Sequence, residues 1–331
     1  MNPNNLRIMK KINKLIISII LPISLFMLTN GCKDSSLLPS VQTTKLTAIT
    51  ASTATGWGNV PSDPGSSISE RGICWNTSSN PTTKNSKATT TAGTGNFSVA
   101  MTGLTMGTKY YARCYATNKT GTSYGNELTF TTLLEDYDGN TYHTITIGNQ
   151  VWMAENLKVT KYRNGNAISS ASDPTAWSSL TAGTYCNYSN SSTNKTTYGT
   201  LYNWYAVNDA RVIAPTGWHV PTQAEWTTLI NYLGNASIAG DILKETGNTH
   251  WSGTYTAATN ASGFTALPGG YVGQQNNVYG FYGIGTDGYW WTATEVDSNT
   301  ASSWSLNNNS PLAVPSSTAK QYGFSIRCVK D

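Results

Sequence analysis

Apolar and polar positions divide the chain into three stretches with different patterns. Residues 15–28 form a run of 14 positions that is nearly all apolar and follows a basic segment. Between residues 41 and 132, short alternating stretches rich in Thr are separated by Gly, Pro and Asn. Beyond residue 133 aromatic side chains replace many aliphatic ones, and one clear helical period occurs.

The alternating stretches predict an all-β sandwich for residues 41–133, because alternation with period two is typical of strands that bury one face. No helical period interrupts them. The strands that we expect span residues 45–50, 53–59, 68–76, 96–101, 109–118 and 127–132.

The helical period follows Thr222, whose side chain is placed to cap a helix with Glu225 three residues later. The apolar positions that follow have the spacing of one helix face, and Gly234 ends the pattern. They are Trp226, Leu229, Ile230 and Leu233. We therefore expect Glu225 to be a structural cap and not a catalytic acid.

The apolar run is too short to cross a membrane. Fourteen residues rise about 21 Å as a helix, whereas the hydrocarbon core is about 30 Å thick. A signal peptide over residues 1–31 fits better. The following Thr29-Asn30-Gly31-Cys32 resembles the lipobox of bacterial lipoproteins, in which the cysteine is lipidated and becomes the new N-terminus. The alternative is an ordinary secreted protein with a spare cysteine.

Residues 33–36 (KDSS) resemble the short export tag of surface lipoproteins from Bacteroidetes. This resemblance implies a lipid anchor at Cys32 in the outer membrane, with the protein facing the cell exterior. Each buried methylene of the acyl chains contributes about 0.8 kcal/mol to membrane binding. Residues 32–40 are then a linker between the anchor and the sandwich.

The net charge of +4 suggests an acidic partner such as nucleic acid, but the distribution of the charges does not support one. Four of the 21 basic residues belong to the leader, so the remaining chain has 17 basic and 17 acidic groups. It also lacks any block of Lys and Arg that could follow a phosphate backbone. We therefore expect no nucleic-acid partner.

Several segments of the sandwich resemble a fibronectin type III domain in the variant common on Bacteroidetes surfaces. They are residues 70–75, 104–110, 111–118 and 121–126. The turn that ends at Tyr110 is similar to a tyrosine corner. The segment around Ser123 matches the G-x-S-x-G pattern of serine hydrolases, but a nucleophile elbow needs a helix after the serine. A strand follows here, which predicts that Ser123 lies in a hairpin loop and is not catalytic.

Residues 134–331 resemble a second family. Residues 136–158 (DYDGNTYHTITIGNQVWMAENLK) are similar to the start of the Fibrobacter succinogenes major paralogous domain. Further matching blocks follow in order at residues 198–207, 214–226, 264–270, 289–295 and 322–331. The family is common on bacterial surfaces and has no established biochemical activity, so the resemblance implies a surface protein without assigning a reaction.

Two blocks of this domain, residues 220–226 and 323–327, also resemble the formylglycine-generating enzyme group, which has a C-type-lectin-like fold. The fold class that we expect is an all-β sandwich followed by an α+β C-type-lectin-like domain. The enzymes of that group use a close cysteine pair to bind copper, whereas Cys186 and Cys328 each lack a neighbouring cysteine. We therefore predict no enzyme, no catalytic residue and no cofactor; a related enzyme is the alternative.

Other motifs of the second domain do not point to a ligand. The G-x-G-x-x-G pattern at residues 283–288 is followed by a strand-like segment, although a dinucleotide fingerprint must open a helix. The acidic residues 136–140 fit a turn better than a calcium loop. The three histidines are scattered without zinc-ligand spacing, so we predict no metal site. They are His143, His219 and His250.

Without Cys32, four cysteines remain, two in each domain. An even number in an oxidising compartment favours disulfides. The candidate pairs are Cys74–Cys114 and Cys186–Cys328. Four reduced, buried thiols are the alternative.

The densest stretch of aromatic and amide side chains lies in the last third of the chain. Aromatic rings stack on sugar rings and amides bond their hydroxyls, so this stretch is our candidate ligand site. Its residues are Tyr279, Tyr282, Tyr289, Trp290, Trp291, Trp304 and Asn307. The alternative for each is a place in the core, because this domain has few aliphatic residues.

The sequence as a whole predicts a surface-exposed lipoprotein without catalytic activity, which binds glycans or other surface proteins through its C-terminal domain. A structural component of the cell surface is a further alternative. The two predict different behaviour, since the structural component would associate with itself and lack a ligand pocket.

The anchor is tested by replacing Cys32 with Ala. Without a lipidated cysteine the protein has no acyl chains to hold it, so we expect it to move from the membrane fraction to the soluble fraction of fractionated cells. A Cys32→Ala protein that stays in the membrane fraction contradicts the lipid anchor.

Overall fold

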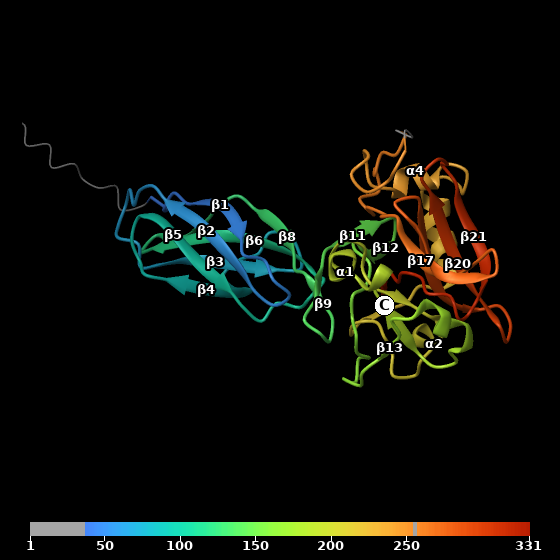
Figure 1. Ribbon diagram of the computed structural model, residues 1–331. Coiled ribbons are helices and arrows are strands. Elements are labelled where there is room, and N and C mark those ends of the chain that lie inside the picture. Colours follow the sequence, from blue (N-terminus) through green and yellow to red (C-terminus); the bar gives the residue numbers. More distant parts are fainter. Residues whose placement is uncertain (1–36, 254–256) are drawn as a thin grey trace, which may run out of the picture.

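A computed structural model of the chain describes residues 37–253 and 257–331. The leader and Cys32 lie outside these residues. The described chain forms two lobes that lie side by side (Figure 1). We call residues 37–133 the sandwich and residues 134–331 the second domain. Within the described ranges, no helix combines the length and the apolar character that a membrane crossing needs.

The sandwich consists of two antiparallel sheets, as the alternating pattern predicts. One sheet has the order β1-β2-β5, and the other has the order β4-β3-β6-β7 with β8 also paired to β6. Buried side chains such as Ile73, Phe97 and Met101 fill the space between them. The strands are β1 (Gln42–Thr47), β2 (Ala54–Val60), β3 (Glu70–Asn76), β4 (Ser86–Thr90), β5 (Gly95–Met101), β6 (Lys109–Asn118), β7 (Gly121–Tyr124) and β8 (Leu128–Thr131).

Two local predictions for the sandwich are confirmed. The Thr105 N–H donates to the Tyr110 hydroxyl at 3.0 Å, which is the hydrogen bond of a tyrosine corner. Ser123 lies in β7, which pairs with β6 as a hairpin across Asn118 and Gly121. A serine within a hairpin strand has no nucleophile elbow. Two strands were not predicted. Most side chains of β4 are exposed and do not alternate in polarity, and β7 occupies residues that we expected to form a loop.

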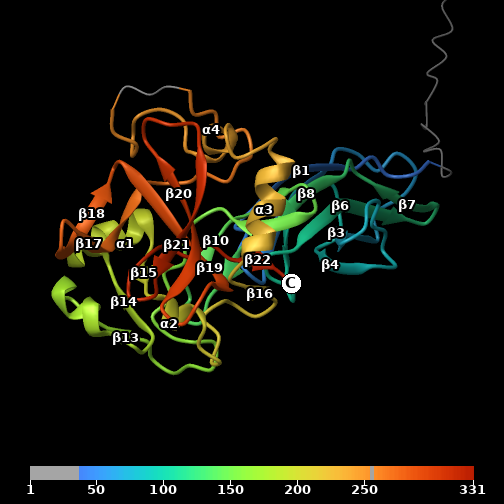
Figure 2. The ribbon, with the colours of Figure 1, turned by 90° about the vertical axis from the view of Figure 1, so that its right-hand side faces the viewer.

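The second domain contains many short strands around one larger sheet, which has the order β18-β17-β19-β20-β21 (Figure 2). A four-stranded sheet has the order β11-β12-β22-β16 and so contains the end of the chain. The strands are β9 (Leu134–Glu135), β10 (Thr141–Tyr142), β11 (Thr144–Ile147), β12 (Gln150–Met153), β13 (Ser169–Ser170), β14 (Thr184–Cys186), β15 (Leu201–Tyr202), β16 (Trp218–His219), β17 (Gly269–Gln275), β18 (Val278–Ile284), β19 (Asp287–Glu295), β20 (Thr300–Asn307), β21 (Ala313–Ala319) and β22 (Val329–Lys330).

The helices of this domain are short. Among its described residues, two are 3₁₀ helices and four are α-helices. They are η1 (Pro174–Ser179), η2 (Tyr188–Asn190), α1 (Ser192–Tyr198), α2 (Trp204–Val207), α3 (Gln223–Tyr232) and α4 (Ala239–Leu243). The predicted capping box begins α3: the Thr222 hydroxyl accepts from the Glu225 N–H, and the Glu225 carboxylate accepts from the Thr222 N–H. Helix α3 buries Trp226, as its period predicts.

Two turns also agree with the sequence. The Asp136 carboxylate accepts hydrogen bonds from the backbone N–H groups of Asp138 and Asn140, which explains the acidic segment as turn chemistry. The G-x-G-x-x-G segment connects β18 to β19, and a strand follows it.

A buried hydrogen-bond network connects distant parts of the second domain. The Asn156 Oδ1 accepts from Trp290 Nε1 at 2.9 Å, from Arg327 Nη2 at 3.0 Å and from Arg327 Nε at 3.1 Å. The Asn156 amide nitrogen donates to the Tyr198 carbonyl. The Arg327 guanidinium also donates to the carbonyl of Phe264. Asn156 and Arg327 together therefore connect β19, the last residues of the chain and the segment before β17.

The two domains meet without a free linker. The Leu133 N–H donates to the carbonyl of Thr50 in the sandwich, while the next side chain, Leu134, is fully buried in the second domain. Met106 from the sandwich packs against the same second-domain core. At Gly107 (φ +56°), an added Cβ would lie only 3.1 Å from the Trp218 ring. Close packing and hydrogen bonds thus connect the two domains directly.

The Asn156 network predicts a large loss of stability for Asn156→Leu. This change keeps the side-chain size but leaves the Trp290 N–H and two Arg327 donors buried without their acceptor, so we expect the free energy of unfolding to fall by about 3–5 kcal/mol. Urea denaturation measures it. Asn309→Leu, at an exposed position, is the control and is expected to change it by less than about 0.5 kcal/mol. Equal effects of the two substitutions contradict the network's role.

Candidate functional site

The three tryptophans of the predicted ligand site belong to the core, so that part of the prediction was wrong. Trp290, Trp291 and Trp304 are 1%, 0% and 4% exposed. Each indole N–H is also used inside the protein: Trp290 donates to Asn156, Trp291 to the Tyr202 carbonyl and Trp304 to Gln223. The physical reason is that β19 is a central strand with a core on each side. Neighbouring side chains on a strand point to opposite faces, so both faces take a tryptophan.

Asn307 does not present a free amide. Its Nδ2 donates to Asp287 Oδ1 at 2.7 Å, and its Oδ1 accepts from the Asn309 N–H at 3.0 Å. Asp287 and Asn307 are partners at the end of the β19–β20 pair, so this hydrogen bond connects the two strands there.

The tyrosines of the prediction are half-buried and contact two others. We call the five half-buried residues Tyr271, Tyr279, Tyr282, Tyr289 and Tyr322 the tyrosine platform. The Tyr271 ring is central: its centroid lies 5.6 Å from that of Tyr282, 5.1 Å from Tyr289 and 6.0 Å from Tyr322. Tyr279 contacts Tyr322 at 6.3 Å. The rings thus form one connected aromatic cluster, whose members pack partly against two buried cores.

A pair of glycines makes room for two of these rings. Gly273 of β17 and Gly280 of β18 face each other across the strands. A Cβ on Gly273 would lie 2.3 Å from the Tyr322 ring, and one on Gly280 would lie 2.9 Å from the Tyr282 ring. Glycine is therefore needed at both positions for the tyrosines to lie across the sheet.

Buried contacts hold the platform in one arrangement. Phe324 is 2% exposed and stacks on Tyr289 at 4.8 Å, while its other contacts include Trp291 at 4.6 Å. The hydroxyls of Tyr282 and Tyr322 donate to the carbonyls of Val278 and Gln274. Burial, with a smaller contribution from the Asp287 carboxylate, raises the pKa of Tyr289 to about 12, so its hydroxyl is neutral and able to donate at physiological pH.

Polar side chains border the platform at the turn between β17 and β18. The turn residues Asn276 and Asn277 both have positive φ, as a two-residue hairpin turn requires. With Gln274 and Gln275 they place four exposed amide side chains beside the tyrosines. The surface is therefore aromatic at its centre and uncharged but polar at this edge.

Sequence reasoning missed Tyr271 and Tyr322. They are 51 positions apart, and no local pattern connects them. Their neighbourhood depends on the antiparallel pairing of β17 with β18 and on the path of the chain after β21. One signal was available. Gly273 and Gly280 are each three residues from the Asn276-Asn277 turn, so a hairpin with this turn pairs the two glycines across the strands. Paired glycines leave space on the sheet for another side chain.

The three histidines each face a carboxylate in a separate place. His143 pairs with Glu155, His250 with Glu245, and His219 with both Glu225 and Asp331. Burial lowers the pKa of His219, but its hydrogen bonds to Asp331 and Glu225 outweigh burial and raise it overall. Among the described residues, no cluster of three or more His, Cys, Asp or Glu could hold a metal ion.

The sequence pattern of the Fibrobacter succinogenes major domain matches residues 145–330, which is more than half of the chain. The chain belongs to this family. The whole tyrosine platform lies within the matched major domain. None of the curated proteins matches the chain.

Solved structures match about a third of the chain. The sensor domain of the anti-sigma factor RsgI4 from Pseudobacteroides cellulosolvens is 19% identical over 30% of this chain and 97% of that chain, with a TM-score of 0.23. The sixth fibronectin type III domain of human fibronectin type III domain containing protein 3 is 23% identical over 29% and 88% of the two chains, also with a TM-score of 0.23.

The predicted disulfides are absent from the structure, where all four cysteines are free and buried. Cys114 pairs with Ile73 across β6 and β3, so the next residue, Cys74, points to the opposite face of the same sheet. In the major domain, Cys186 and Cys328 belong to different hydrophobic clusters. Neither pair of side chains is placed to form a bond.

The thiols are expected to react only after unfolding. Burial raises the pKa of Cys74 to about 11 and that of Cys114 to about 12, and it also raises the pKa of Cys186 and Cys328, so little thiolate forms at pH 8. Intact mass after treatment of residues 33–331 with iodoacetamide, without reductant, is expected to show no adducts in the native protein and four in denaturant. Fewer than four adducts in denaturant indicate a disulfide.

Proposed function

We propose that this protein is a surface-anchored lipoprotein whose major domain binds a glycan through the tyrosine platform. Lipid at Cys32 would hold it in the outer membrane facing outward, and the sandwich would act as a spacer. The C-type-lectin-like fold of the major domain belongs to the same proposal. The observation that carries it is a connected cluster of five half-buried tyrosine rings beside four exposed amide side chains.

The chemistry of the platform suits a neutral saccharide. Aromatic faces cover the apolar C–H faces of sugar rings, while tyrosine hydroxyls and amides exchange hydrogen bonds with sugar hydroxyls. Tyrosine supplies a large contact area with few rotatable bonds. Because the rings already contact one another and Phe324, little conformational entropy is lost on binding, which favours affinity.

The arrangement of the domains supports display away from a membrane. Strand β6 starts beside the joint between the domains, and Asn118 at its other end donates to the carbonyl of Leu37. The ten residues of β6 span about 33 Å as an extended strand. The chain thus enters the sandwich at the end opposite the major domain (Figure 1). A lipid at Cys32 would place the platform on the far side of this spacer.

The proposal is tested by a glycan array with soluble residues 33–331. We expect saturable binding that Tyr282→Ala and Tyr322→Ala each weaken by about tenfold, the loss of about 1.4 kcal/mol of contact energy. Tyr282→Phe, which keeps the ring, is expected to weaken it less. Tyr232→Ala removes a tyrosine that is 64% exposed outside the platform and is the matched control.

Circular dichroism and urea denaturation must show that each variant is folded. Absence of binding to plant, mucin and microbial glycans contradicts the glycan proposal and leaves a protein partner or a structural role. Binding that the tyrosine substitutions leave unchanged places the glycan site elsewhere.

A further inference from the structure

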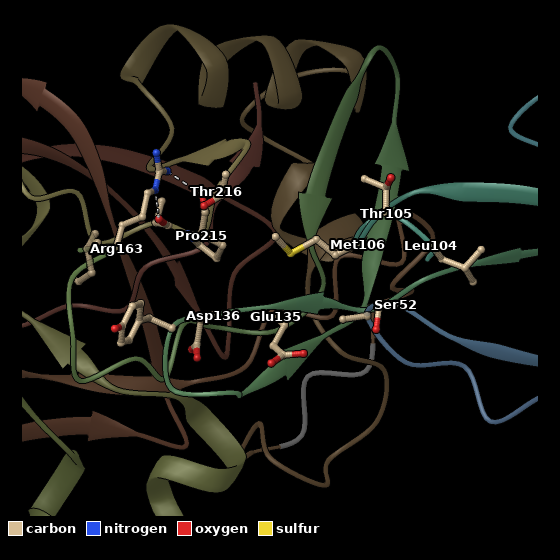
Figure 3. Close-up of a pocket in the computed structure, with 13 residues that line it drawn as sticks. Ser52, Leu104, Thr105, Met106, Glu135, Asp136, Arg163, Pro215 and Thr216 are labelled. Atoms are coloured by element: carbon tan, nitrogen blue, oxygen red, sulfur yellow. Dashed lines mark hydrogen bonds between the residues drawn. The ribbon is translucent and has the colours of Figure 1, made fainter. Parts of the chain in front are cut away.

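A cavity of about 510 Å³ lies where the two domains meet, away from the tyrosine platform. Figure 3 shows Ser52, Leu104 and Thr105 from the sandwich on one side of it and Arg163 and Thr216 from the second domain on the other. Clefts between domains are common ligand sites, and this volume is within the range of such sites. None of the five platform tyrosines lines it.

Part of the wall of the cavity is apolar. Leu104 and Met106 contribute from the sandwich, and Ile213, Ala214 and Pro215 from the second domain. Methionine adapts its shape to different partners and is common at binding surfaces. This wall can take an apolar side chain.

Most polar groups at the cavity are already used. Arg163 donates through Nε and Nη2 to the carbonyls of Ala214, Pro215 and Trp218. The Asp136 carboxylate accepts from its own turn and from Tyr142. In contrast, the exposed Glu135 carboxylate forms no hydrogen bond or ion pair within the described ranges. It is the free anion of this cavity.

The backbone of Glu135 is also open. The Asp136 N–H donates to the Asn140 carbonyl, so these two residues form a hydrogen-bonded pair of the antiparallel ladder. The next pair, Glu135 and Thr141, is therefore a non-hydrogen-bonded pair. The N–H and C=O groups of Glu135 point away from β10. Strand β9 pairs only with β10 among the described strands, which leaves its other edge free. On that edge the Leu133 N–H donates to the Thr50 carbonyl, and the Leu133 carbonyl accepts from the Gly107 N–H of the sandwich. The backbone groups of Glu135, two residues later on the same edge, have no such partner within the described ranges.

We propose that this cavity binds an extended peptide segment that carries a Lys or Arg beside an apolar residue. The peptide backbone continues the hydrogen bonds of the β9 edge at Glu135, as in strand addition to an open sheet edge. The apolar residue packs against Leu104, Met106 and Ile213, and the basic side chain pairs with the Glu135 carboxylate. The proposal is independent of glycan binding.

The probe is the blocked peptide acetyl-Gly-Leu-Lys-Leu-Gly-amide, titrated into ¹⁵N-labelled residues 33–331 and followed by NMR. We expect saturable shifts of the Ser52, Thr105 and Glu135 amides. Ser52→Trp places a large ring at the exposed rim and is expected to weaken binding more than tenfold. Ser98→Trp, at an exposed position on the outer face of β5, is the matched control and is expected to leave the affinity unchanged.

A double-mutant cycle tests the role of Glu135. Replacing the peptide Lys with Gln is expected to weaken binding to the unchanged protein by up to about fivefold, as for an exposed ion pair, and to have no effect on Glu135→Gln. If replacing the peptide Lys with Gln weakens binding to the Glu135→Gln protein as much as to the unchanged protein, the assigned ion pair is wrong. No saturable shift, or shifts insensitive to Ser52→Trp, overturns the site itself and leaves the glycan result unaffected.

Discussion

The second domain depends on how it accommodates the buried charge of Arg327. This side chain is 1% exposed, and burial lowers its pKa to about 9, which shows how strongly the interior disfavours the cation. Asn156 and the carbonyls of Phe264 and Thr265 supply oxygen acceptors in place of a carboxylate. Because those acceptors belong to segments far apart in the chain, satisfying one guanidinium holds the segments together.

The residues around Arg327 extend this network to the rest of the protein. Tyr322 and Phe324, a few positions earlier, form and support the tyrosine platform. Lys330, a few positions later, donates to the Gly107 carbonyl of the sandwich. Ten residues at the end of the chain thus connect the binding surface, the buried network and the joint between domains. The platform and the cavity at the joint are both held by packing, which favours binding with little rearrangement.

Local features could be predicted from the sequence. The capping box at Thr222, the tyrosine corner at Tyr110 and the hairpin around Ser123 each depend on residues within a few positions of one another. The candidate site could be predicted only in part. Tyr279, Tyr282 and Tyr289 keep part of their surface exposed, whereas Trp290, Trp291 and Trp304 are core residues, and Tyr271 and Tyr322 were missed. Burial of a tryptophan depends on what covers its strand, which a local pattern does not contain.

The sequence by itself determined the two-domain order, the β architecture of the first domain and the family of the second, because alternation, turn residues and family motifs are local. Only the tertiary structure decided which aromatic side chains face solvent, that Cys74 and Cys114 point to opposite faces of one sheet, and that Glu135 opens into a cavity between domains. The physical reason is that exposure and proximity follow from strand pairing and packing between segments far apart in the chain, as with Asn156 and Arg327, which are 171 residues apart.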